Sequence, residues 1–348
     1  MLLVGGYTTQ REGAGTGKAR GISAYDFFPS DGSLRFLGFT PAVNPSYLLT
    51  DRRRGVVYAV REASAEAAAA ITAHRVQKDK RGKVHFELIS ERALSGDDPC
   101  HLAFAGEALV VSCYSSAHVF IFARQEDGSI GDELQRFQLT SGTDQPSRAH
   151  CTAFQEEKKR LYVCDTGGHQ LRVFDRDENG TFQHQEAKDL TFKDASGPRH
   201  IALHPAGKHA VVNGERLGVV HLLDISGEKP LIFHTANALP ERVIDQAHGA
   251  AIRLGHNGKM VYASDRSFSV INSLRIDERA QKLIFRDTFP SGGESPRDLA
   301  ISPNGEWLLT ANTDNHTIAV FRIDPKGELI HYHTFRKIPS PTSLAWIG

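Results

Sequence analysis

Arginine, histidine and carboxylate side chains recur at matching points along this 348-residue sequence, about once in every 50 residues. Arg199 stands at the start of the apolar stretch "PRHIAL", and Glu215 stands at the end of the next one, "AVVNGE". Guanidinium groups bind carboxylates and phosphates through paired hydrogen bonds, and an imidazole such as that of His150 transfers protons near neutral pH. Brought together, these groups would bind a small anion and move a proton beside it.

The positions of these residues follow an internal repeat, which indicates the elements that hold them. Seven stretches open with polar or proline residues and continue as an apolar strand: "NPSYLLT", "DPCHLAF", "RAHCTAF", "GPRHIAL", "HGAAIRL", "SPRDLAI" and "SPTSLAW". A second apolar run follows each of the first six, and these runs end 46 to 52 residues apart, at Glu62, Tyr114, Asp165, Glu215, Arg266 and Asn312. Amphipathic runs with a central turn, such as "LRVFDRDENGTFQHQEA", lie between repeats and indicate β-hairpins. About four strands in about 50 residues is the unit of a β-propeller blade.

The last stretch, "SPTSLAWIG", has no second run after it, and its partner is expected at the other end of the chain. Residues 2–7, "LLVGGY", match "LVVSCY" at 109–114 in length and character. Pairing of the terminal segments would complete one blade and close the ring, which removes open sheet edges. The sequence therefore predicts an all-β fold, a single seven-bladed β-propeller domain over residues 1–348. The stretch "EASAEAAAAITAHRV" has a helical composition, but the repeat predicts the third strand of a blade there.

The repeat also predicts two rings of residues around one opening. In a propeller the first strand of each blade lines the central channel and the second strand runs back antiparallel to it, so the start of the first strand and the end of the second lie at the same end of the channel. The first ring is Ser46, Cys100, His150, Arg199, Ala250, Arg297 and Thr342. The second ring is Tyr7, Glu62, Tyr114, Asp165, Glu215, Arg266 and Asn312.

Charge is concentrated on one arc of this opening, whereas the opposite arc is neutral apart from Glu62. The charged arc consists of His150, Asp165, Arg199, Glu215, Arg266 and Arg297. Such an arc favours a site for a small anionic ligand. The alternative is that the arginines and carboxylates only satisfy one another as buried polar groups.

Two further residues of the opening have both a structural and a chemical interpretation. Cys100 holds the ring position that His150 holds in the next blade, but no base adjacent in sequence activates it, so a buried reduced thiol is expected. His200 lies one residue inside the inner strand, where it either contacts the ligand or forms hydrogen bonds between blades.

The composition excludes several classes of partner. The chain has 41 basic and 41 acidic residues, and this balance argues against nucleic acid or an anionic membrane as a partner. The N-terminus, "MLLVGGYTTQREG", lacks the features of a signal peptide, and no apolar stretch approaches the ~20 residues of a membrane span. The four cysteines lack zinc-binding spacing and predict free thiols in a cytoplasmic protein. No metal or cofactor is expected, and the oligomeric state is left open.

With these motifs, the chain resembles the seven-bladed β-propeller lactonase family over essentially its whole length. The resemblance rests on "VGGYTT", "NPSYLL", "DPCHLAF", "SGPRHIALHP", "VVNGE" and "SPRDLAISPNGEWLLTAN", and the order "GPRH…GE…DR…PRD" is specific. The family includes one type of 6-phosphogluconolactonase and an enzyme that interconverts carboxymuconate and its lactone. In that muconate-lactonising relative, the proposed site uses a His, an Arg, a Glu and a second Arg, which fall here on His150, Arg199, Glu215 and Arg266.

The resemblance implies a lactonase that acts without a cofactor on a small anionic lactone, with 6-phospho-D-glucono-1,5-lactone as the expected substrate. Arg199 and Arg266 would stabilise the carbonyl oxygen as it becomes negative, or clamp the anionic group. His150 would transfer protons, and Glu215 would share that duty if burial raises its pKa. The predicted substrate-binding residues are Arg297, Asp165, Tyr114, Glu62 and His200.

The chain departs from the family at two points in the second strands. Cys113 before Tyr114 and Asp265 before Arg266 stand where the family usually has asparagine. The carboxylate of Asp265 is expected to weaken the attraction of Arg266 for an anionic substrate.

Three alternatives remain open at this stage. The substrate is another lactone, of the muconate or unphosphorylated type; or Asp165, Glu215 and Glu62 hold a divalent cation, which the arginines disfavour; or the propeller binds a protein and catalyses nothing. A second arginine near Arg199 would favour the phosphorylated lactone, and a tight apolar pocket would favour the other lactones, of the muconate or unphosphorylated type. An exposed apolar patch would favour a protein partner.

Overall fold

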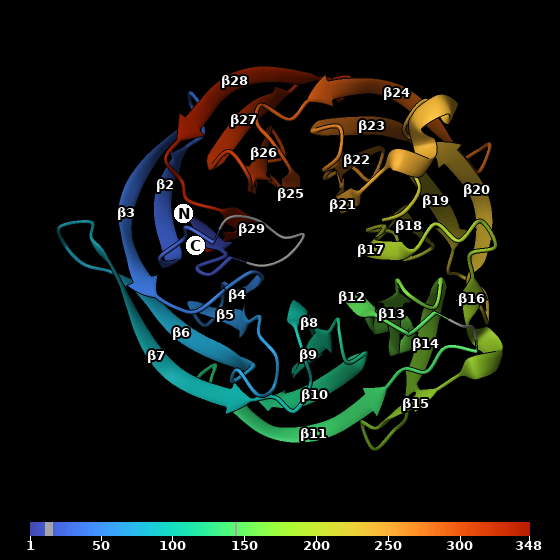
Figure 1. Ribbon diagram of the computed structural model, residues 1–348, viewed down its shortest axis with the longest axis horizontal. Helices are drawn as coiled ribbons and strands as arrows, with labels where there is room; N and C mark the ends of the chain where they lie inside the picture. The colour runs from blue at the N-terminus through green and yellow to red at the C-terminus, as the bar shows by residue number, and fades with distance from the viewer. Residues whose placement is uncertain (11–16, 143–144) are drawn as a thin grey trace.

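The computed structural model describes residues 1–10, 17–142 and 145–348. They form seven antiparallel sheets arranged as a ring around a central channel (Figure 1). We number these sheets blades 1 to 7 in chain order and name the strands of each blade from the channel outward. The seven-bladed β-propeller predicted from the repeat is confirmed.

The strands of the seven blades have the following bounds. Blade 1 consists of β29 (Pro341–Trp346), β1 (Leu2–Gly6), β2 (Gly21–Phe28) and β3 (Ser33–Pro41). Blade 2 consists of β4 (Leu48–Asp51), β5 (Val56–Arg61), β6 (Ala70–Lys78) and β7 (Val84–Ala93). Blade 3 consists of β8 (Pro99–Ala105), β9 (Ala108–Cys113), β10 (His118–Arg124) and β11 (Ile130–Gln138). Blade 4 consists of β12 (Ala149–Gln155), β13 (Arg160–Asp165), β14 (Gln170–Arg176), β15 (Phe182–His184) and β16 (Leu190–Thr191).

The remaining blades follow the same order. Blade 5 consists of β17 (Pro198–Leu203), β18 (His209–Gly214), β19 (Val219–Asp224) and β20 (Leu231–Asn237). Blade 6 consists of β21 (Gly249–Leu254), β22 (Met260–Asp265), β23 (Val270–Asp277) and β24 (Lys282–Pro290). Blade 7 consists of β25 (Pro296–Ile301), β26 (Trp307–Asn312), β27 (Thr317–Ile323) and β28 (Leu329–Arg336). Three short 3-10 helices lie in connections: η1 (Glu156–Lys158), η2 (Glu186–Lys188) and η3 (Glu241–Gln246).

The two ends of the chain meet in blade 1, as the unpaired last repeat predicted. β29 pairs antiparallel with β1, with Leu3 opposite Ala345, and β1 pairs on its other side with β2. The labels of the two termini lie close together beside β29 in Figure 1. The C-terminal segment thus supplies the innermost strand of the blade that the N-terminal segment begins.

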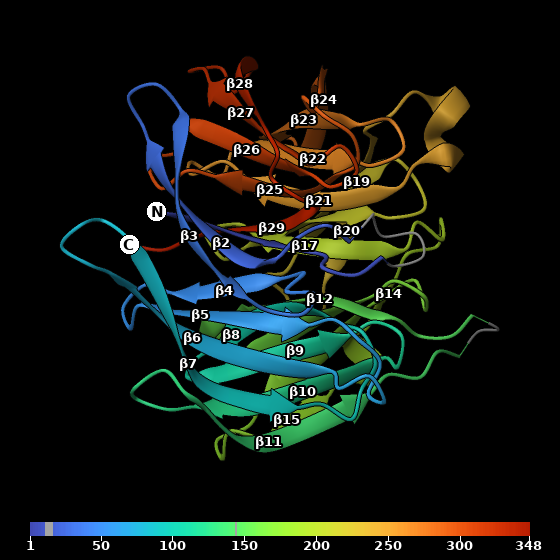
Figure 2. The same cartoon turned by 60° about the vertical axis from the view of Figure 1, so that its left-hand side comes forward.

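The second strand of each blade is buried along nearly its whole length because each blade packs against two neighbours. Every residue of β9 is buried, and one hydrophobic cluster joins Tyr58 and Val60 of blade 2 to Leu109 and Phe120 of blade 3. The outermost strands, which face solvent on one side, alternate instead, as β11 does. Figure 2 shows blade 2 from the side, with β4 to β7 next to one another in that order.

The alanine-rich stretch that has a helical composition forms no helix. Residues 65–68 make a turn, in which Ala68 has a φ of +64°, and β6 follows as the third strand of blade 2. Strand pairing with β5 and β7 therefore overrides local helix propensity, as the period predicted.

The outer hairpins turn on short acidic and glycine residues, as predicted. Between β14 and β15, Oδ1 of Asp177 accepts hydrogen bonds from the backbone N–H groups of Asn179 and Thr181. Gly180 completes the turn with a φ of +85°, a conformation that glycine adopts without a steric penalty. Within the described parts of the chain, no helix is long and apolar enough to cross a membrane.

Candidate active site

The residues of the first predicted ring reach the channel because β-bulges turn them inward. β8 pairs Pro99 with Cys113 and His101 with Ser112, which leaves Cys100 as an extra residue without a partner across the ladder. The same shift leaves Arg199 unpaired in β17 and Arg297 unpaired in β25. A bulge re-aims the side chain at which it occurs, so the repeated irregularity places one side chain from each of these blades at the same end of the channel.

The second ring is confirmed in five blades and wrong by one residue in two. One backbone hydrogen bond identifies the second-ring position in each blade. The residue at that position donates its N–H group to a carbonyl of the loop that leads into the innermost strand. The residues that make it are Tyr7, Glu62, Tyr114, Thr166, Glu215, Arg266 and Thr313. Thr166 therefore takes the place predicted for Asp165, and Thr313 takes that of Asn312.

A shift of one residue moves a side chain to the other face of its strand, and Asp165 shows the result. Its carboxylate is fully buried and accepts hydrogen bonds from the backbone N–H groups of Arg148 and Gly168, the hydroxyl of Ser147, and the guanidinium of Arg172. Asp165 thus fastens the loops around the end of β13 and does not line the central cavity. At the ring position itself, Thr166 donates a 2.7 Å hydrogen bond from Oγ1 to the carbonyl of Pro198.

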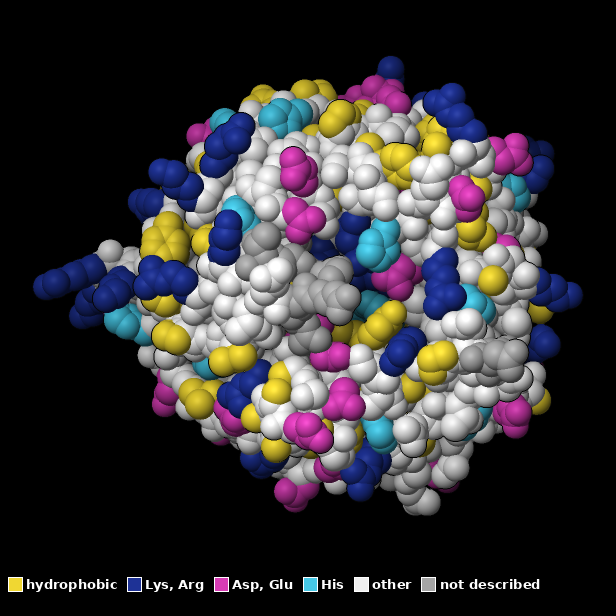
Figure 3. All heavy atoms as spheres, in the orientation of Figure 1, with side chains coloured by type: hydrophobic (Ala, Val, Ile, Leu, Met, Phe, Trp, Pro, Cys, Tyr) yellow, Lys and Arg dark blue, Asp and Glu magenta, His cyan; other side chains and the backbone are white. Residues whose placement is uncertain are grey.

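Most of the remaining predicted residues line a cavity at the mouth of the channel, whereas Tyr114, Glu215 and Arg266 lie outside its lining. Figure 3 shows a hollow at the centre of this face, in which basic, acidic and histidine side chains gather. The cavity is small, with about 20 Å³ open to the centres of water molecules, and it is lined by Ser46, Tyr47, Glu62, Cys100, His150, Arg199, His200, Arg297, Asp298 and Thr342. Large exposed hydrophobic residues such as Phe36, Leu88 and Leu134 lie elsewhere, on outermost strands.

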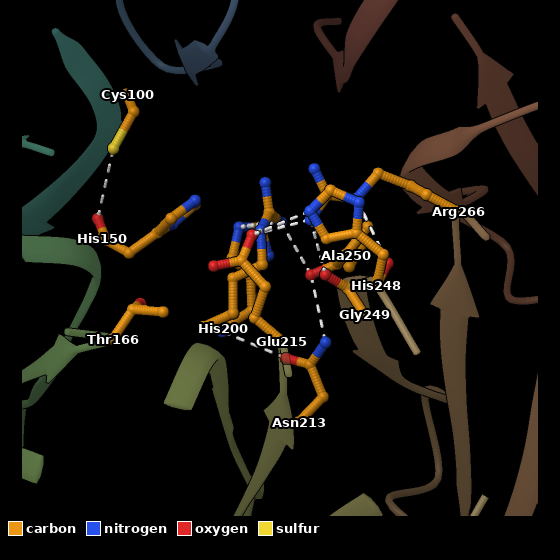
Figure 4. Close-up of polar contacts among 12 residues, drawn as sticks. Cys100, His150, Thr166, His200, Asn213, Glu215, His248, Gly249, Ala250 and Arg266 are labelled. Atoms are coloured by element: carbon orange, nitrogen blue, oxygen red, sulfur yellow. Dashed lines mark hydrogen bonds and ion pairs between the residues drawn. The ribbon is translucent and has the colours of Figure 1, made fainter. Parts of the chain in front are cut away.

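Glu215 holds two arginines from neighbouring blades at the edge of this cavity (Figure 4). Its Oε1 lies 2.7 Å from Nη2 of Arg266 and 3.3 Å from Nε of Arg199. Burial acts to raise the pKa of Glu215, but the charges of Arg266 and Arg199 outweigh it, so the pKa lies below its ordinary value. The condition under which Glu215 would share the proton transfer, a raised pKa, is therefore not met, and Glu215 is ionised at neutral pH.

Each of these two guanidiniums is anchored on one side. Arg199 Nη1 donates to the carbonyl of Ala250 at 2.7 Å and to Nε2 of His200 at 3.1 Å. Arg266 donates through Nε to the carbonyl of His248 and through Nη2 to the carbonyl of Gly249 as well as to Glu215. Among the described residues, Nη2 of Arg199 and Nη1 of Arg266 make no hydrogen bond, so both keep donors for a ligand.

Arg297 supplies a third cation, which is compensated differently. Its guanidinium lies 5.2 Å from the ring centroid of Tyr7, and the Tyr7 hydroxyl donates to both carboxylate oxygens of Glu62 at 3.1 Å. Burial acts to lower the pKa of Arg297, but Tyr7 and Glu62 outweigh it and the pKa is raised. Within the described part of the chain, the Arg297 guanidinium makes neither a hydrogen bond nor an ion pair.

Histidine rings line the inner side of the cavity. The ring of His150 lies 5.1 Å from that of His200 and 5.8 Å from that of Tyr114, centroid to centroid. Burial, followed by the charge of Arg199, lowers the pKa of both histidines well below 6.5. Both imidazoles are therefore neutral at neutral pH, and Nδ1 of His150 is free to accept a proton from a ligand or water.

His200 takes part in hydrogen bonds between blades, which is one of the two roles that the sequence suggested for it. Because Nε2 of His200 accepts from Arg199, the neutral ring carries its proton on Nδ1. The backbone N–H of His200 donates to the side chain of Asn213, which in turn donates to the carbonyl of Ala250 in blade 6. His200 nevertheless lines the cavity as well, so it fits both interpretations.

His248 is a site residue that belongs to neither predicted ring. It lies in the loop before β21, and its Nε2 is 3.7 Å from Oε1 of Glu215, with 46% of its side chain exposed. Burial, followed by the charge of Arg266, lowers its pKa to about 4. The available signal was its place as the first residue of the repeat stretch "HGAAIRL", because the loop at that place accepts the backbone hydrogen bond that marks the second ring in every blade.

The two residues that depart from the family pattern, Asp265 and Cys113, do not line the cavity. Asp265 accepts hydrogen bonds from the backbone N–H groups of His248 and Phe268, as Asp165 does in blade 4. Its carboxylate makes no ion pair with Arg266 within the described residues, and Arg266 pairs with Glu215 instead. Cys113 is buried in the core between blades 2 and 3.

Cys100 faces the cavity but is not activated. Its thiol donates weakly to the carbonyls of Ala149 and His150, at 3.7 and 3.9 Å. Burial, followed by the charge of Glu62, raises the pKa of this thiol well above 9. Since the thiolate is the nucleophilic form, Cys100 fits the predicted reduced, unactivated thiol, but it is half-buried and not buried as predicted. Across the described ranges, no group of three or more His, Cys, Asp and Glu residues is placed to hold a metal ion.

Comparison with known proteins places this arrangement in a family. The family described as "Lactonase, 7-bladed beta-propeller" matches residues 1–346. A 6-phosphogluconolactonase of Formosa agariphila is 28% identical over 93% of this chain and 92% of its own length. A 6-phosphogluconolactonase of Bacillus subtilis is 24% identical over 87% of each chain.

Solved structures have the same fold. The crystal structure of a putative 6-phosphogluconolactonase from Bacteroides fragilis superposes with a TM-score of 0.88 at 25% identity, over 100% of this chain and 97% of that one. A periplasmic gluconolactonase of Pseudomonas aeruginosa gives a TM-score of 0.89 at 23% identity, over 100% and 98% of the two chains.

Proposed function

This chain belongs to the seven-bladed β-propeller lactonase family, and we propose that it hydrolyses 6-phospho-D-glucono-1,5-lactone to 6-phosphogluconate. The observation that carries the proposal is the charge of the cavity. Glu215 compensates two arginines, Arg199 and Arg266, while Arg297 lines the same cavity without an ion pair among the described residues. A phosphorylated lactone brings the anionic group that such a cation binds.

His150 is the general base of the proposed reaction. Its neutral ring takes a proton from a water molecule as the water oxygen attacks the lactone carbonyl carbon. The C–O bond to the ring oxygen then breaks, and the protonated His150 returns its proton to that oxygen. Water is thereby split between the new carboxylic acid and the new hydroxyl group, and no other reactant is consumed.

The free donors of Arg199 and Arg266 stabilise the carbonyl oxygen while it is negative. Glu215 acts as a positioning residue: its ionised carboxylate keeps both guanidiniums at the edge of the cavity. Arg297 binds the phosphate, and Tyr114, Glu62 and His200 complete the wall against which the substrate lies. The geometry supports no such role for Asp165, whose carboxylate is occupied by the loops of blade 4.

The test is hydrolysis of freshly generated 6-phospho-D-glucono-1,5-lactone, with the spontaneous rate subtracted. The wild type should accelerate hydrolysis, and His150→Ala and Arg199→Ala should each reduce kcat about 10²–10³-fold. His85→Ala, on the exposed outermost strand of blade 2, is the matched histidine control and should retain full activity. A wild-type protein that leaves the spontaneous rate unchanged would refute the assignment. If the protein hydrolyses only unphosphorylated glucono-1,5-lactone, the substrate assignment changes to that lactone.

We also propose that the protein works in the cytoplasm. All four cysteines carry free thiols in the structure, although two of them, Cys151 and Cys164, belong to the same hydrophobic cluster. Free thiols are typical of reducing compartments. Fractionation of the native cells, with a periplasmic marker as the reference, tests this location.

A further inference from the structure

Four buried polar atoms without a hydrogen-bond partner among the described residues line the cavity. They are Oγ of Ser46, Nδ1 of His150, Nε of Arg199 and Nδ1 of His200. Arg199 Nε has the ion-pair contact with Glu215 at 3.3 Å, so three atoms are left without any partner. Ser46, His150 and His200 are each more than nine-tenths buried.

Unpartnered buried polar atoms also occur elsewhere in the described chain, but they are scattered. Ser112 in β9 is an example: its Oγ has no partner, and the residue does not line the cavity. Leaving one buried polar group unsatisfied destabilises the folded state by about 1–3 kcal/mol. Three such groups around one cavity therefore indicate that something polar occupies it when the protein works.

The chemistry of the three atoms identifies what that group is. Nδ1 of His200 is a donor, because Nε2 accepts from Arg199. The Ser46 hydroxyl both donates and accepts, and the neutral His150 ring offers its unpartnered nitrogen. A carboxylate or phosphate only accepts, and it is served better by the arginines. A carbon-bound hydroxyl group both donates and accepts, so it matches this mixed set.

We infer that Ser46 and His200 form a hydroxyl-binding subsite beside the base His150, and that this subsite selects a polyhydroxylated lactone over an unsubstituted or muconate-type one. The inference rests on the proposed function and deepens it by naming how the substrate's ring is recognised. Thr342 supports the arrangement, because its Oγ1 donates to the carbonyl of Ser46 at 2.9 Å and fixes this residue across the closure of the ring. Ser46 is thus a specificity-determining residue.

The experiment compares two phosphates of equal chain length and equal charge by calorimetric titration: 6-phosphogluconate, which carries hydroxyl groups, and 6-phosphonooxyhexanoate, which keeps the carboxylate and the phosphate but has no free hydroxyl group. The wild type should bind 6-phosphogluconate at least 10-fold more tightly. Ser46→Ala should weaken that binding about 10-fold, the worth of one good hydrogen bond, and leave the affinity for 6-phosphonooxyhexanoate unchanged. Ser112→Ala, which removes an unpartnered buried hydroxyl outside the cavity, should change neither affinity.

Several results would overturn the subsite. They are equal affinity of the wild type for the two phosphates, no binding of either, or equal losses for both in Ser46→Ala. The wild-type comparison needs no variant, so it decides the matter even if Ser46→Ala fails to fold. The proposed function fails separately: a protein that prefers 6-phosphogluconate but does not accelerate lactone hydrolysis has the subsite without the activity.

Discussion

Arg266 reaches across from blade 6 to Glu215 at the end of the second strand of blade 5, and the 2.7 Å contact between Nη2 and Oε1 joins the two blades at the mouth of the channel. The same carboxylate oxygen faces Arg199 of its own blade. One negative charge thus orients two cations that would otherwise repel each other, which leaves both guanidiniums aimed at the cavity.

The role of Glu215 is testable with Glu215→Gln, which keeps the shape of the side chain and removes its charge. We expect kcat/KM to fall about 10–100-fold, because charge-assisted hydrogen bonds to the two arginines are lost. The acid side of the pH–rate profile should stay in place, since Glu215 is not the proton acceptor. Loss of that acid limb in the variant would instead identify Glu215 as the base.

The pH dependence of catalysis should reflect the neutral state of His150. A general base works only when unprotonated, and the pKa of His150 lies well below 6.5 because of burial and the charge of Arg199. The profile of kcat/KM should therefore be flat from pH 7.5 through about 6.5 and fall only at lower pH. Arg297→Gln removes another positive charge that lowers this pKa, so its acid limb should move to higher pH. A wild-type limb centred at or above 6.5 would contradict the assignment.

Arg297 should govern affinity for the anionic group. Because its guanidinium makes no ion pair or hydrogen bond within the described chain, Arg297→Ala should raise KM for the phosphorylated lactone about 10-fold or more and change the thermal midpoint little. For the unphosphorylated lactone the KM should stay nearly constant. Equal effects on the two lactones would mean that Arg297 does not contact the phosphate.

Asp165 should matter to stability and not to catalysis. Asp165→Ala leaves the buried guanidinium of Arg172 with a weaker set of partners and removes hydrogen bonds from two backbone N–H groups. We expect a loss of about 3–5 kcal/mol in the free energy of unfolding, measured by denaturant titration. The kcat of the folded fraction should remain near that of the wild type. A selective 10²-fold loss of kcat would instead show that Asp165 takes part in catalysis.

The neutral buried histidines should make the fold sensitive to acid. Burial lowers the pKa of His101 to about 3, so between pH 6.5 and 3 its ring is protonated in the unfolded chain and not in the folded one. The unfolded chain then binds more protons, and the free energy of unfolding decreases as the pH falls through this window, by up to about 1.4 kcal/mol per pH unit for each such group. His101→Gln should show a shallower decrease than the wild type in denaturant titrations at pH 7, 6 and 5, and the surface variant His85→Gln should match the wild type.

Much of this architecture could be read from the sequence because a blade repeats its hydrogen-bonding pattern. The period identified the closure of β1 on β29 and assigned β6 correctly against its helical composition. The repeat alone did not fix the register to one residue, because the second strands of blades 4 and 7 end in "YVCDTG" and "LLTANT", where Asp or Asn precedes the true ring position. The polar residues Asp165 and Asn312 fit the sequence pattern, whereas the backbone hydrogen bonds place Thr166 and Thr313 at the ring positions.

Three features of the site were not predicted from residue types. The pKa of Glu215 depends on whether burial or two neighbouring cations dominates, and that balance needs distances. The importance of Ser46 depends on its hydroxyl being unpartnered inside a cavity, which composition and spacing do not encode. His248 opens a repeat stretch but lies two residues before the predicted ring position of Ala250, so neither ring included it.

The pairing of β1 with β29 has a consequence for how the protein is made. Blades 2 to 7 consist of strands that leave the ribosome consecutively, but blade 1 lacks its innermost strand until Pro341–Trp346 emerge. Thr342 comes only with that strand, and Leu344 and Trp346 pack there against Ala300 and Trp307 of blade 7. A nascent chain that has not reached this strand therefore holds an open ring and an incomplete ligand cavity. Catalytic competence then requires that β29 has been synthesised and has paired with β1.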